Sequence, residues 1–420
     1  MPVHRWRAIL SPLLLCAFAL TSLSLLAFLA GCVRPTPTPE PVTIAFAYLD
    51  IGVGEAYRKW AQAFHERYPH ITVQLQPMKG DSLDGTDIDK ADAFVTTQFA
   101  MSGLQKENRI LDLGPFVEQD KSFRADDLYP GTLALFGREG KTWAIPASAD
   151  LMVVYYNQDL FDQRKVPYPK GDWTWNDFLN AAVALRDPDA NVFGYAPRYG
   201  IFDPLSFIYQ HGGRIFDDLA NPTRTTFDDP RTIEALDWYV KLVFRYNVIP
   251  TPEQAQTLFG QGGMEAAINQ GKVGMWSGML SEQGGSYELS PWSMRWGMAP
   301  MPGDARRAAL TLMDGYFISA KAQYPDACWK WIAFLSQQIP ARQAPVRKSH
   351  VVSAEYRQHA GEGVAALVRD SMKGVLLLSP RLAEFEGIEG TFGQAWEAIM
   401  AQRATPAEAM TQAQRESRYK

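Results

Sequence analysis

The chain has 420 residues, of which 46% are hydrophobic and 21% charged, the composition of an ordinary globular protein. Because this length exceeds the size at which a single hydrophobic core stops growing, we expect two lobes or domains. The net charge of -5 gives no basis for nucleic-acid binding, which requires a basic face.

The first 31 residues are typical of a lipoprotein signal peptide. Basic residues at positions 4, 5 and 7 precede a mostly apolar run over residues 9–30, and Ala30 and Gly31 stand directly before Cys32. This ending looks like a bacterial lipobox, in which Cys32 is lipidated and becomes the mature N-terminus. A plain membrane anchor is the alternative, because the apolar run is long enough to span a bilayer. Residues 32–42 are rich in Pro and Thr, which predicts an extended tether.

The remainder of the chain is expected to lie outside the membrane. After the signal no segment reaches the ~18 consecutive apolar residues that a spanning helix needs. Once Cys16 and Cys32 are assigned to the signal and the lipid, Cys328 is the remaining cysteine, so no internal disulfide is expected. Its Trp-rich helical surroundings predict a thiol in the core.

The first part of the body alternates strands with helices. Strands are predicted over residues 42–48, 71–75 and 91–95, and helices before Pro69 and over residues 97–106. This alternation indicates a mainly parallel α/β sheet.

Residues 143–161 predict a connection between two lobes. A first strand meets the small and polar residues 146–150, and an apolar run over residues 151–156 then resumes as a second strand. A strand that pauses and resumes is suited to crossing from one lobe to another. Tyr155 and Tyr156 are predicted to be core residues of the second lobe.

The alternation then starts again. Thr174 is predicted to begin a helix, with Asp177 three residues later as an approximate capping box, and Pro230 begins another. Further strands are predicted over residues 193–195, 272–276, 294–298 and 315–319. Helices are predicted after Pro325 and over residues 391–400 and 406–416.

Five short motifs occur in a characteristic order behind the lipobox. They are YYNQDLF at 155–161, TWNDF at 174–178, GKVGM at 271–275, GYFIS at 315–319 and ACWKWI at 327–332. In this order they resemble the extracellular solute-binding proteins of bacterial ABC importers, in the carbohydrate-binding, maltose-binding-protein-like branch. The resemblance covers nearly the whole mature chain.

The resemblance implies a two-lobe α/β fold of the type II periplasmic-binding-protein class, with hinge crossings and a cleft between the lobes. The first lobe would comprise residues 43–149 and 315–345, and the second residues 150–314 and 346–420. It also implies a monomeric, lipid-anchored, extracytoplasmic protein that delivers a sugar or oligosaccharide to the permease subunits of an ABC importer. Neither a cofactor nor a metal is expected.

Candidate ligand-binding residues follow from the rule that ligands in open α/β sheets sit beyond the carboxyl ends of strands. The rule and the crossings select Tyr48, Asp50, Glu55, Thr97, Gln98, Trp143, Asp150, Arg198, Tyr199, Trp276, Asp314 and Tyr316. The resemblance adds Glu389 near the C-terminal ligand region.

These residue types suit a neutral polyol. Aromatic faces stack on the CH faces of a sugar ring, and the polar side chains pair with its hydroxyls. The chain departs from the family at Gly278-Met279-Leu280, where a glycine-tryptophan step often stands, so a stacking tryptophan would have to come from elsewhere.

Several catalytic or metal-binding patterns are incomplete. The segment from Gly52 to Glu55 lacks the third glycine of a dinucleotide loop, and Pro69 would break a zinc-protease helix between His65 and His70. The acidic residues Asp81, Asp84, Asp87 and Asp89 do not have EF-hand spacing.

Two other functions remain open. A secreted glycoside hydrolase would need two carboxylates across one cleft, and Asp50, Asp150, Asp314 and Glu389 are candidates. A sensory binding protein that serves a receptor is the second, and it could bind a solute other than a sugar. The leading expectation is a binding protein without catalysis.

Overall fold

The structure, a computed structural model, describes residue 1 and residues 40–50, 52–78, 87–219, 222–286, 290–379 and 390–419. The predicted signal, Cys32, most of the tether, Asp81, Asp84 and Glu389 lie outside the described residues. Within the described ranges, no helix is both long and apolar enough to cross a membrane. Val42–Lys420 forms one compact unit.

A mixed sheet is the centre of this unit. Nine described strands join in the order β2-β1-β3-β12-β6-β8-β7, with β13 paired to β12 and β11 paired to β6. Their bounds are β1 (Val42–Leu49), β2 (Ile71–Met78), β3 (Ala93–Thr97), β6 (Ile145–Asn157), β7 (Phe193–Ala196), β8 (Val273–Met279), β11 (Trp296–Pro300), β12 (Ala309–Ile318) and β13 (Val375–Leu377). Two-residue strands form two small ladders, β4 (Gly137–Arg138) with β5 (Lys141–Thr142) and β9 (Gly285–Ser286) with β10 (Ser290–Pro291).

The parallel sheet predicted for the first part of the body is confirmed among β1, β2 and β3, whereas the centre of the whole sheet is antiparallel. β1 runs parallel to β2 and β3, and β7 runs parallel to β8. However, β12 is antiparallel to β3 and β6, and β6 is antiparallel to β8. The sheet therefore has two parallel parts joined by the antiparallel strands β6 and β12.

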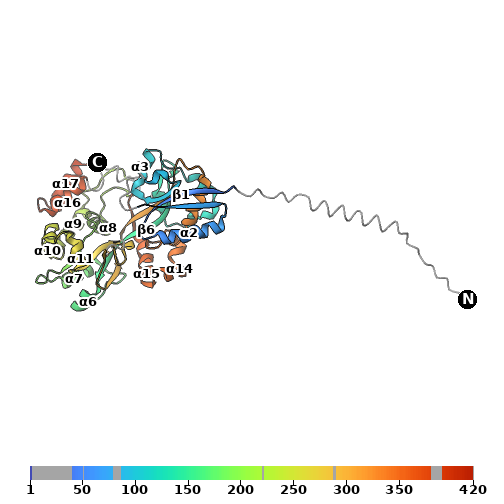
Figure 1. The fold of residues 1–420 in the computed structure, drawn as a ribbon. Helices are drawn as coiled ribbons and strands as arrows, with labels where there is room; N and C mark the ends of the chain where they lie inside the picture. Colours follow the sequence, from blue (N-terminus) through green and yellow to red (C-terminus); the bar gives the residue numbers. More distant parts are fainter. Residues whose placement is uncertain are drawn as a thin grey trace. The chain divides into compact units, whose positions relative to one another are not determined.

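Helices flank both parts of the sheet. The α-helices are α2 (Gly54–Arg67), α3 (Met101–Lys106), α4 (Gly114–Gln119), α5 (Thr132–Leu135), α6 (Gln158–Arg164), α7 (Trp175–Leu185), α8 (Phe202–Gln210), α9 (Pro230–Phe244), α10 (Pro252–Phe259), α11 (Gly263–Asn269), α12 (Pro325–Leu335), α13 (Lys348–Val351), α14 (Ala354–Ala360), α15 (Glu362–Ser371), α16 (Thr391–Met400) and α17 (Pro406–Glu416). Short 3₁₀ helices are η1 (Asp87–Lys90), η2 (Gln98–Ala100), η3 (Lys121–Phe123), η4 (Ala125–Asp127), η5 (Leu280–Glu282) and η6 (Met372–Gly374). Figure 1 shows α2 and α3 beside β1, and α7, α9, α10 and α11 at the other end of the unit.

Local sequence explains where α7 begins. The Thr174 side chain accepts a hydrogen bond from the Asp177 backbone N–H, and the Asp177 carboxylate accepts one from the Thr174 backbone N–H. The predicted capping box is therefore confirmed, and it satisfies two donors that the first turn of a helix otherwise leaves free.

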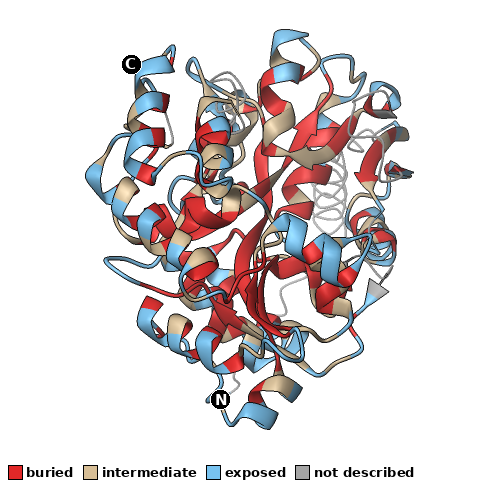
Figure 2. Ribbon diagram, turned by 90° about the vertical axis from the view of Figure 1, so that its left-hand side faces the viewer, coloured by how far each residue is buried: buried red, intermediate tan, exposed pale blue. Residues whose placement is uncertain are grey.

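The predicted pause within residues 146–150 is absent, because β6 is one continuous strand of 13 buried residues. Side chains alternate along a strand, so Val153 and Tyr155 join one hydrophobic cluster while Val154 and Tyr156 join a second. Figure 2 shows buried strands running through the centre of the molecule. The prediction that both tyrosines are core residues is confirmed.

The paired strands β6 and β12, called the crossing below, show an irregularity next to Pro146. The register of β6 with β12 shifts between Asp314 and Gly315, which pair with Ser148 and Pro146. Proline has no N–H to donate to a ladder, and such shifts accommodate it. β12 begins at Ala309, six residues before the strand predicted at Gly315, so both crossing strands are long.

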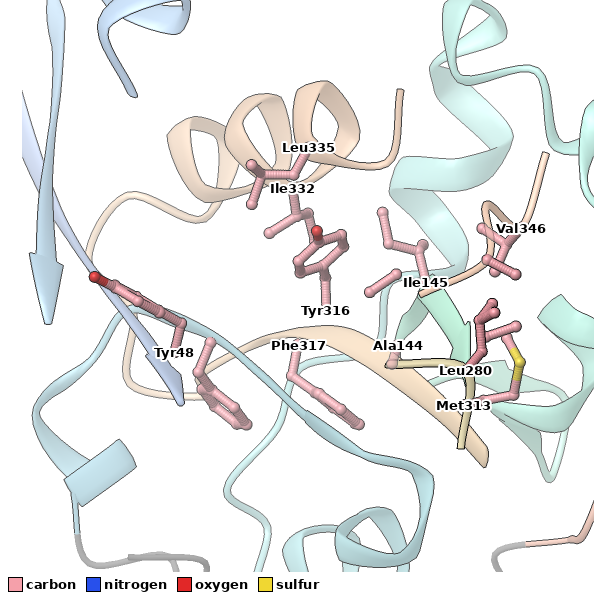
Figure 3. Packing of buried hydrophobic residues seen from close by; sticks show 14 of the residues in the cluster. Tyr48, Ala144, Ile145, Leu280, Met313, Tyr316, Phe317, Ile332, Leu335 and Val346 are labelled. Carbon is pink, nitrogen blue, oxygen red and sulfur yellow. The ribbon is translucent and has the colours of Figure 1, made fainter. Parts of the chain in front are cut away.

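Side chains of α12 cover the far end of β12. Figure 3 shows Tyr316 beneath this helix, close to Ile332 and Leu335. Cys328 on the same helix is fully buried, which confirms the predicted core thiol.

The segment after α12 adds a third connection at the crossing. Ala344 forms a two-way backbone bridge with Ala149 of β6. The buried guanidinium of Arg347 donates to the carbonyl oxygens of Phe123 and Ser336, both at 2.8 Å. Arg347 is thus hydrogen-bonded to residues of the first predicted lobe, although the predicted boundary assigns Arg347 to the second lobe. The lobe boundaries stay a prediction.

Candidate functional site

Two pockets lie beyond the carboxyl ends of parallel strands, where ligands bind in open α/β sheets. The first pocket has a volume of about 110 Å³ and is lined by Leu49 and Thr97, the last residues of β1 and β3. The second pocket has a volume of about 680 Å³ and is lined by Pro197 and Arg198, which follow β7.

The first pocket combines acceptors, donors and aromatic rings. Its lining includes Trp60, Ser148, Asp314, Tyr316 and Gln343. The Asp314 carboxylate accepts a hydrogen bond from Gln343 Nε2 at 2.9 Å, and Ser148 Oγ donates to Gln343 Oε1 at 2.5 Å. Burial raises the pKa of Asp314 above its usual range. The structure therefore brings the predicted site residues Thr97, Asp314 and Tyr316 to one pocket.

Asp150 lies on β6 at the crossing itself. Its carboxylate accepts hydrogen bonds from the Ser281 backbone N–H at 3.0 Å and from Ser281 Oγ at 2.6 Å. Burial raises the pKa of Asp150 to about 7, and the nearby carboxylates of Asp314 and Glu282 act in the same direction. Asp150 shares a face with Ser148, the partner of Asp314, because alternate residues of a strand point the same way.

Glu282 in η5 connects the crossing to the second pocket, and the sequence reasoning did not select it. Its buried carboxylate accepts hydrogen bonds from Arg198 Nη1, from the Tyr199 hydroxyl and from the Met279 backbone N–H at 3.2 Å. The predicted residues Arg198 and Tyr199 are thus held together by one side chain. The rule of carboxyl ends could have found Glu282, since it stands three residues beyond the end of β8.

The second pocket has an ionic end and an aromatic wall. Arg198 Nε donates to Glu265 Oε2 at 2.7 Å. Trp396 of α16 packs edge-to-face on Tyr239 of α9, with ring centroids 5.6 Å apart. Both aromatic residues line the pocket.

The buried carboxylate of Asp203 holds Tyr239, one of the two aromatic residues that line the second pocket. Asp203 is fully buried and accepts hydrogen bonds from the hydroxyl of Tyr195 at 2.8 Å and from that of Tyr239 at 3.1 Å. Burial raises the pKa of Asp203 to about 6. These bonds fix the position of the Tyr239 ring against which Trp396 packs.

Other predicted site residues are buried in this conformation. Gln98 is fully buried, and its amide donates to the Leu378 carbonyl at 2.7 Å and accepts from the Met313 N–H at 2.7 Å. Trp276 is fully buried beside Tyr155. Tyr48 is 2% exposed and packs on Tyr57, 4.4 Å between ring centroids. None of the three side chains lines either of the two pockets described above.

Three other predicted residues, Asp50, Glu55 and Trp143, do not line either pocket. Asp50 is exposed just after β1, and Glu55 on α2 pairs with Lys59 at 2.8 Å on an exposed face. Trp143 is partly buried beneath the ammonium group of Lys141, 5.3 Å from its ring centroid. Within the described part of the chain, no cluster of three or more His, Cys, Asp or Glu side chains could hold a metal ion.

A family model described as bacterial extracellular solute-binding protein matches residues 50–338, more than half of the chain. The chain belongs to this family. Its members are binding proteins of ABC importers rather than enzymes, and an extracellular family implies a location outside the cytoplasm.

One curated relative agrees with this assignment. A mannitol-binding protein of Pseudomonas aeruginosa is 28% identical over 170 residues, which are 39% of this chain and 37% of that relative. The chain therefore matches little more than a third of that curated relative.

Solved structures match over almost the whole chain. An ABC substrate-binding protein from Listeria monocytogenes in complex with cycloalternan has a TM-score of 0.72 at 22% identity, over 90% of this chain and 98% of that one. A solute-binding protein from Agrobacterium vitis with bound D-mannitol has a TM-score of 0.60 at 21% identity, over 89% of this chain and 96% of that one. These likenesses show that the fold is the predicted two-lobe α/β fold.

Proposed function

We propose that this chain captures a neutral sugar or polyol between its two lobes and delivers it to the permease subunits of an ABC importer. The observation that carries the proposal is the polar surface at the crossing. Asp150 and Asp314 share one face of the paired strands β6 and β12, and Asp314 opens into the first pocket.

The residues of the first pocket suit a neutral ligand. Acceptors and donors such as Asp314, Gln343 and Thr97 stand beside the ring of Trp60, which matches the alternating hydroxyl groups and CH faces of a sugar. The names of two of the relatives reported above refer to mannitol, and one solved relative holds cycloalternan. These names support a polyhydroxylated solute for this chain.

Lobe closure would need few backbone changes. Two strands, β6 and β12, and the bridge between Ala149 and Ala344 connect the parts on either side of the crossing. Hinges of this kind concentrate the change in φ and ψ at a few residues while each lobe stays packed.

The test is a melting experiment on the full chain in detergent, followed by tryptophan fluorescence. Neutral saccharides and D-mannitol are compared with amino acids and putrescine. A ligand at 100 times its dissociation constant should add about 2.7 kcal/mol to the free energy of unfolding. Stabilisation by an amino acid or by putrescine, and by no sugar or polyol, would contradict the proposal.

A matched pair of variants then locates the site. Asp314→Ala removes a carboxylate of the first pocket, and Glu55→Ala removes an exposed one that lines neither pocket. Loss of a buried hydrogen-bonding partner costs about 1–3 kcal/mol, so Asp314→Ala should weaken ligand binding roughly 5- to 150-fold. Glu55→Ala should bind as the wild type does. Equal ligand affinities for the two variants would show that Asp314 does not contribute to ligand binding.

We further propose that the chain binds its solute without chemistry, as a monomer anchored to the membrane through a lipid on Cys32. Incubation with oligosaccharides should leave them intact, and any cleavage product would favour the hydrolase alternative. Delivery to a permease rather than to a sensory receptor can be checked by solute uptake after deletion of the gene.

A further inference from the structure

Residues between α12 and α13 form one side of the first pocket. Residues 338–344, called the 338–344 segment below, contain no helix or strand, and Ala344 at its end is held by the two-way backbone bridge with Ala149 of β6. The members of this segment that line the pocket are Gln338, Pro340, Ala341 and Gln343. Because no regular structure fixes them, their positions depend on the bonds that individual residues of the segment make.

Gln343 is the residue of this segment that is bonded to the polar end of the pocket. Its Nε2 donates to the Asp314 carboxylate at 2.9 Å, and its Oε1 accepts from Ser148 Oγ at 2.5 Å. A glutamine amide nitrogen carries two N–H groups, of which Asp314 receives one. No acceptor among the described residues receives the second, so a solute hydroxyl in the pocket can accept it.

The neighbouring residue, Arg342, lines neither of the two pockets. Its Nη2 donates to the backbone carbonyl oxygen of Glu282 at 2.7 Å and to that of Gln283 at 3.1 Å. The Gln283 side chain donates in return from Nε2 to the Arg342 carbonyl oxygen at 3.1 Å. Three hydrogen bonds therefore join Arg342, through its side chain and its backbone, to the end of η5.

The end of η5 is itself fixed to the sheet. The Gln283 backbone N–H donates to the Tyr155 hydroxyl at 3.1 Å, and that hydroxyl donates to the Met279 carbonyl oxygen at 2.8 Å. Tyr155 and Met279 are buried on β6 and β8. A charged donor on carbonyl oxygens makes stronger hydrogen bonds than a neutral one, so Arg342 ties the 338–344 segment to a rigid support.

We propose that Arg342 is a positioning residue for solute recognition in the first pocket. It holds the 338–344 segment against η5, so that Gln343 presents its amide to Asp314 and to the solute, and it does not touch the solute itself. Without these bonds, binding would include the cost of ordering Gln343. This inference rests on the proposed function, since it assumes that a sugar or polyol occupies the first pocket.

The experiment measures affinities by tryptophan fluorescence for the full chain in detergent, because Trp60 lines the first pocket. The probes are D-mannitol and the neutral saccharides of the melting experiment, and the one that binds the wild type most tightly is used for the variants. Arg342→Met keeps an unbranched side chain without donors and should weaken binding about 5-fold or more. Arg342→Lys keeps a charged donor for the two carbonyl oxygens and should stay within about 2-fold of the wild type.

A double-mutant cycle shows whether Arg342 acts through Gln343. In the background of Gln343→Ala, Arg342→Met should change the affinity by less than about 2-fold, because the side chain that Arg342 positions is no longer present. A merely structural arginine would weaken binding by the same factor in both backgrounds. Gln283→Ala removes one bond from the other side and should show the same dependence on Gln343, even if Arg342→Met does not fold.

An arginine elsewhere serves as the control. Arg357 of α14 pairs with the exposed Glu362 and lines neither pocket, so Arg357→Met should keep the wild-type affinity.

The outcomes separate this inference from the proposed function. If neither D-mannitol nor any saccharide of the panel binds the wild type, the proposed function fails and this inference fails with it. If a probe binds but Arg342→Met and Gln283→Ala match the wild type, or if they weaken binding equally with and without Gln343, the assignment of Arg342 alone is overturned.

Discussion

Asp150 should make the stability of this protein depend on pH in a direction that is unusual for a carboxylate. Burial raises its pKa from 3.8 to about 7 in the folded protein. Between these two values the folded state binds more protons than the unfolded state, so the free energy of unfolding falls as pH rises. Below pH 3.8 the stabilisation is complete, and above pH 7 it is lost.

The size of the effect follows from the shift. Each pKa unit corresponds to about 1.4 kcal/mol, so a shift of roughly three units makes the contribution up to about 4 kcal/mol between pH 4 and pH 8. Asp150→Asn removes the titration and keeps the shape. The asparagine oxygen can still accept from the Ser281 N–H, and its amide can donate to Ser281 Oγ. The variant should therefore gain stability relative to the wild type as pH rises.

Urea unfolding followed by tryptophan fluorescence at intervals from pH 4 to pH 8 measures this difference. Asp203 titrates in the same window, but it has no electrostatic interaction with Asp150 among the causes of its shift, so its contribution cancels in the comparison. Asp50→Asn, which changes an exposed carboxylate, serves as the control and should follow the wild-type profile. Parallel profiles for Asp150→Asn and the wild type would refute the reasoning.

Two further changes test the packing and the anchor. A Cβ atom at Gly194 would lie 2.1 Å from the carbonyl oxygen of Ala182, so Gly194→Ala should force β7 away from α7 and lower the free energy of unfolding by about 3 kcal/mol. A loss below 1 kcal/mol in urea unfolding would show that the backbone yields easily there. In cells fed an alkyne-labelled fatty acid, the wild type should acquire the label and Cys32→Ala should not. An unlabelled wild type would favour the plain membrane anchor.

Local chemistry made several elements predictable from the sequence. Thr174 and Asp177 predicted a helix start that the structure confirms, because the cap involves residues only three positions apart. The apolar run at residues 151–156 predicted a buried strand. Tyr155 and Tyr156 are both buried, one in each of the two hydrophobic clusters on either face of β6. The run did not reveal that β6 continues without interruption through Ser148, since small polar residues also occur in buried strands.

The site was harder to predict from the sequence, because its contacts join residues far apart in the chain. Gln98 stands at the carboxyl end of β3, as a ligand residue would, yet its amide is engaged by Leu378 and Met313, 280 and 215 residues away. No pattern around Gln98 indicates those partners. Trp276 stood at the end of the strand predicted over residues 272–276, but β8 continues to Met279 and the ring of Tyr155 on β6 stacks on Trp276.

The sequence by itself determined the family and the two-lobe α/β fold, and it selected Asp150, Asp314 and Arg198 as candidate polar residues of the site. These features depend on short motifs and on the period of each strand, which neighbouring residues carry. Only the tertiary structure decided that Glu282 binds Arg198 across 84 residues and that Trp396 faces the second pocket. Burial and pairing are properties of the packed chain, and they set both the charge of a carboxylate and the exposure of a ring.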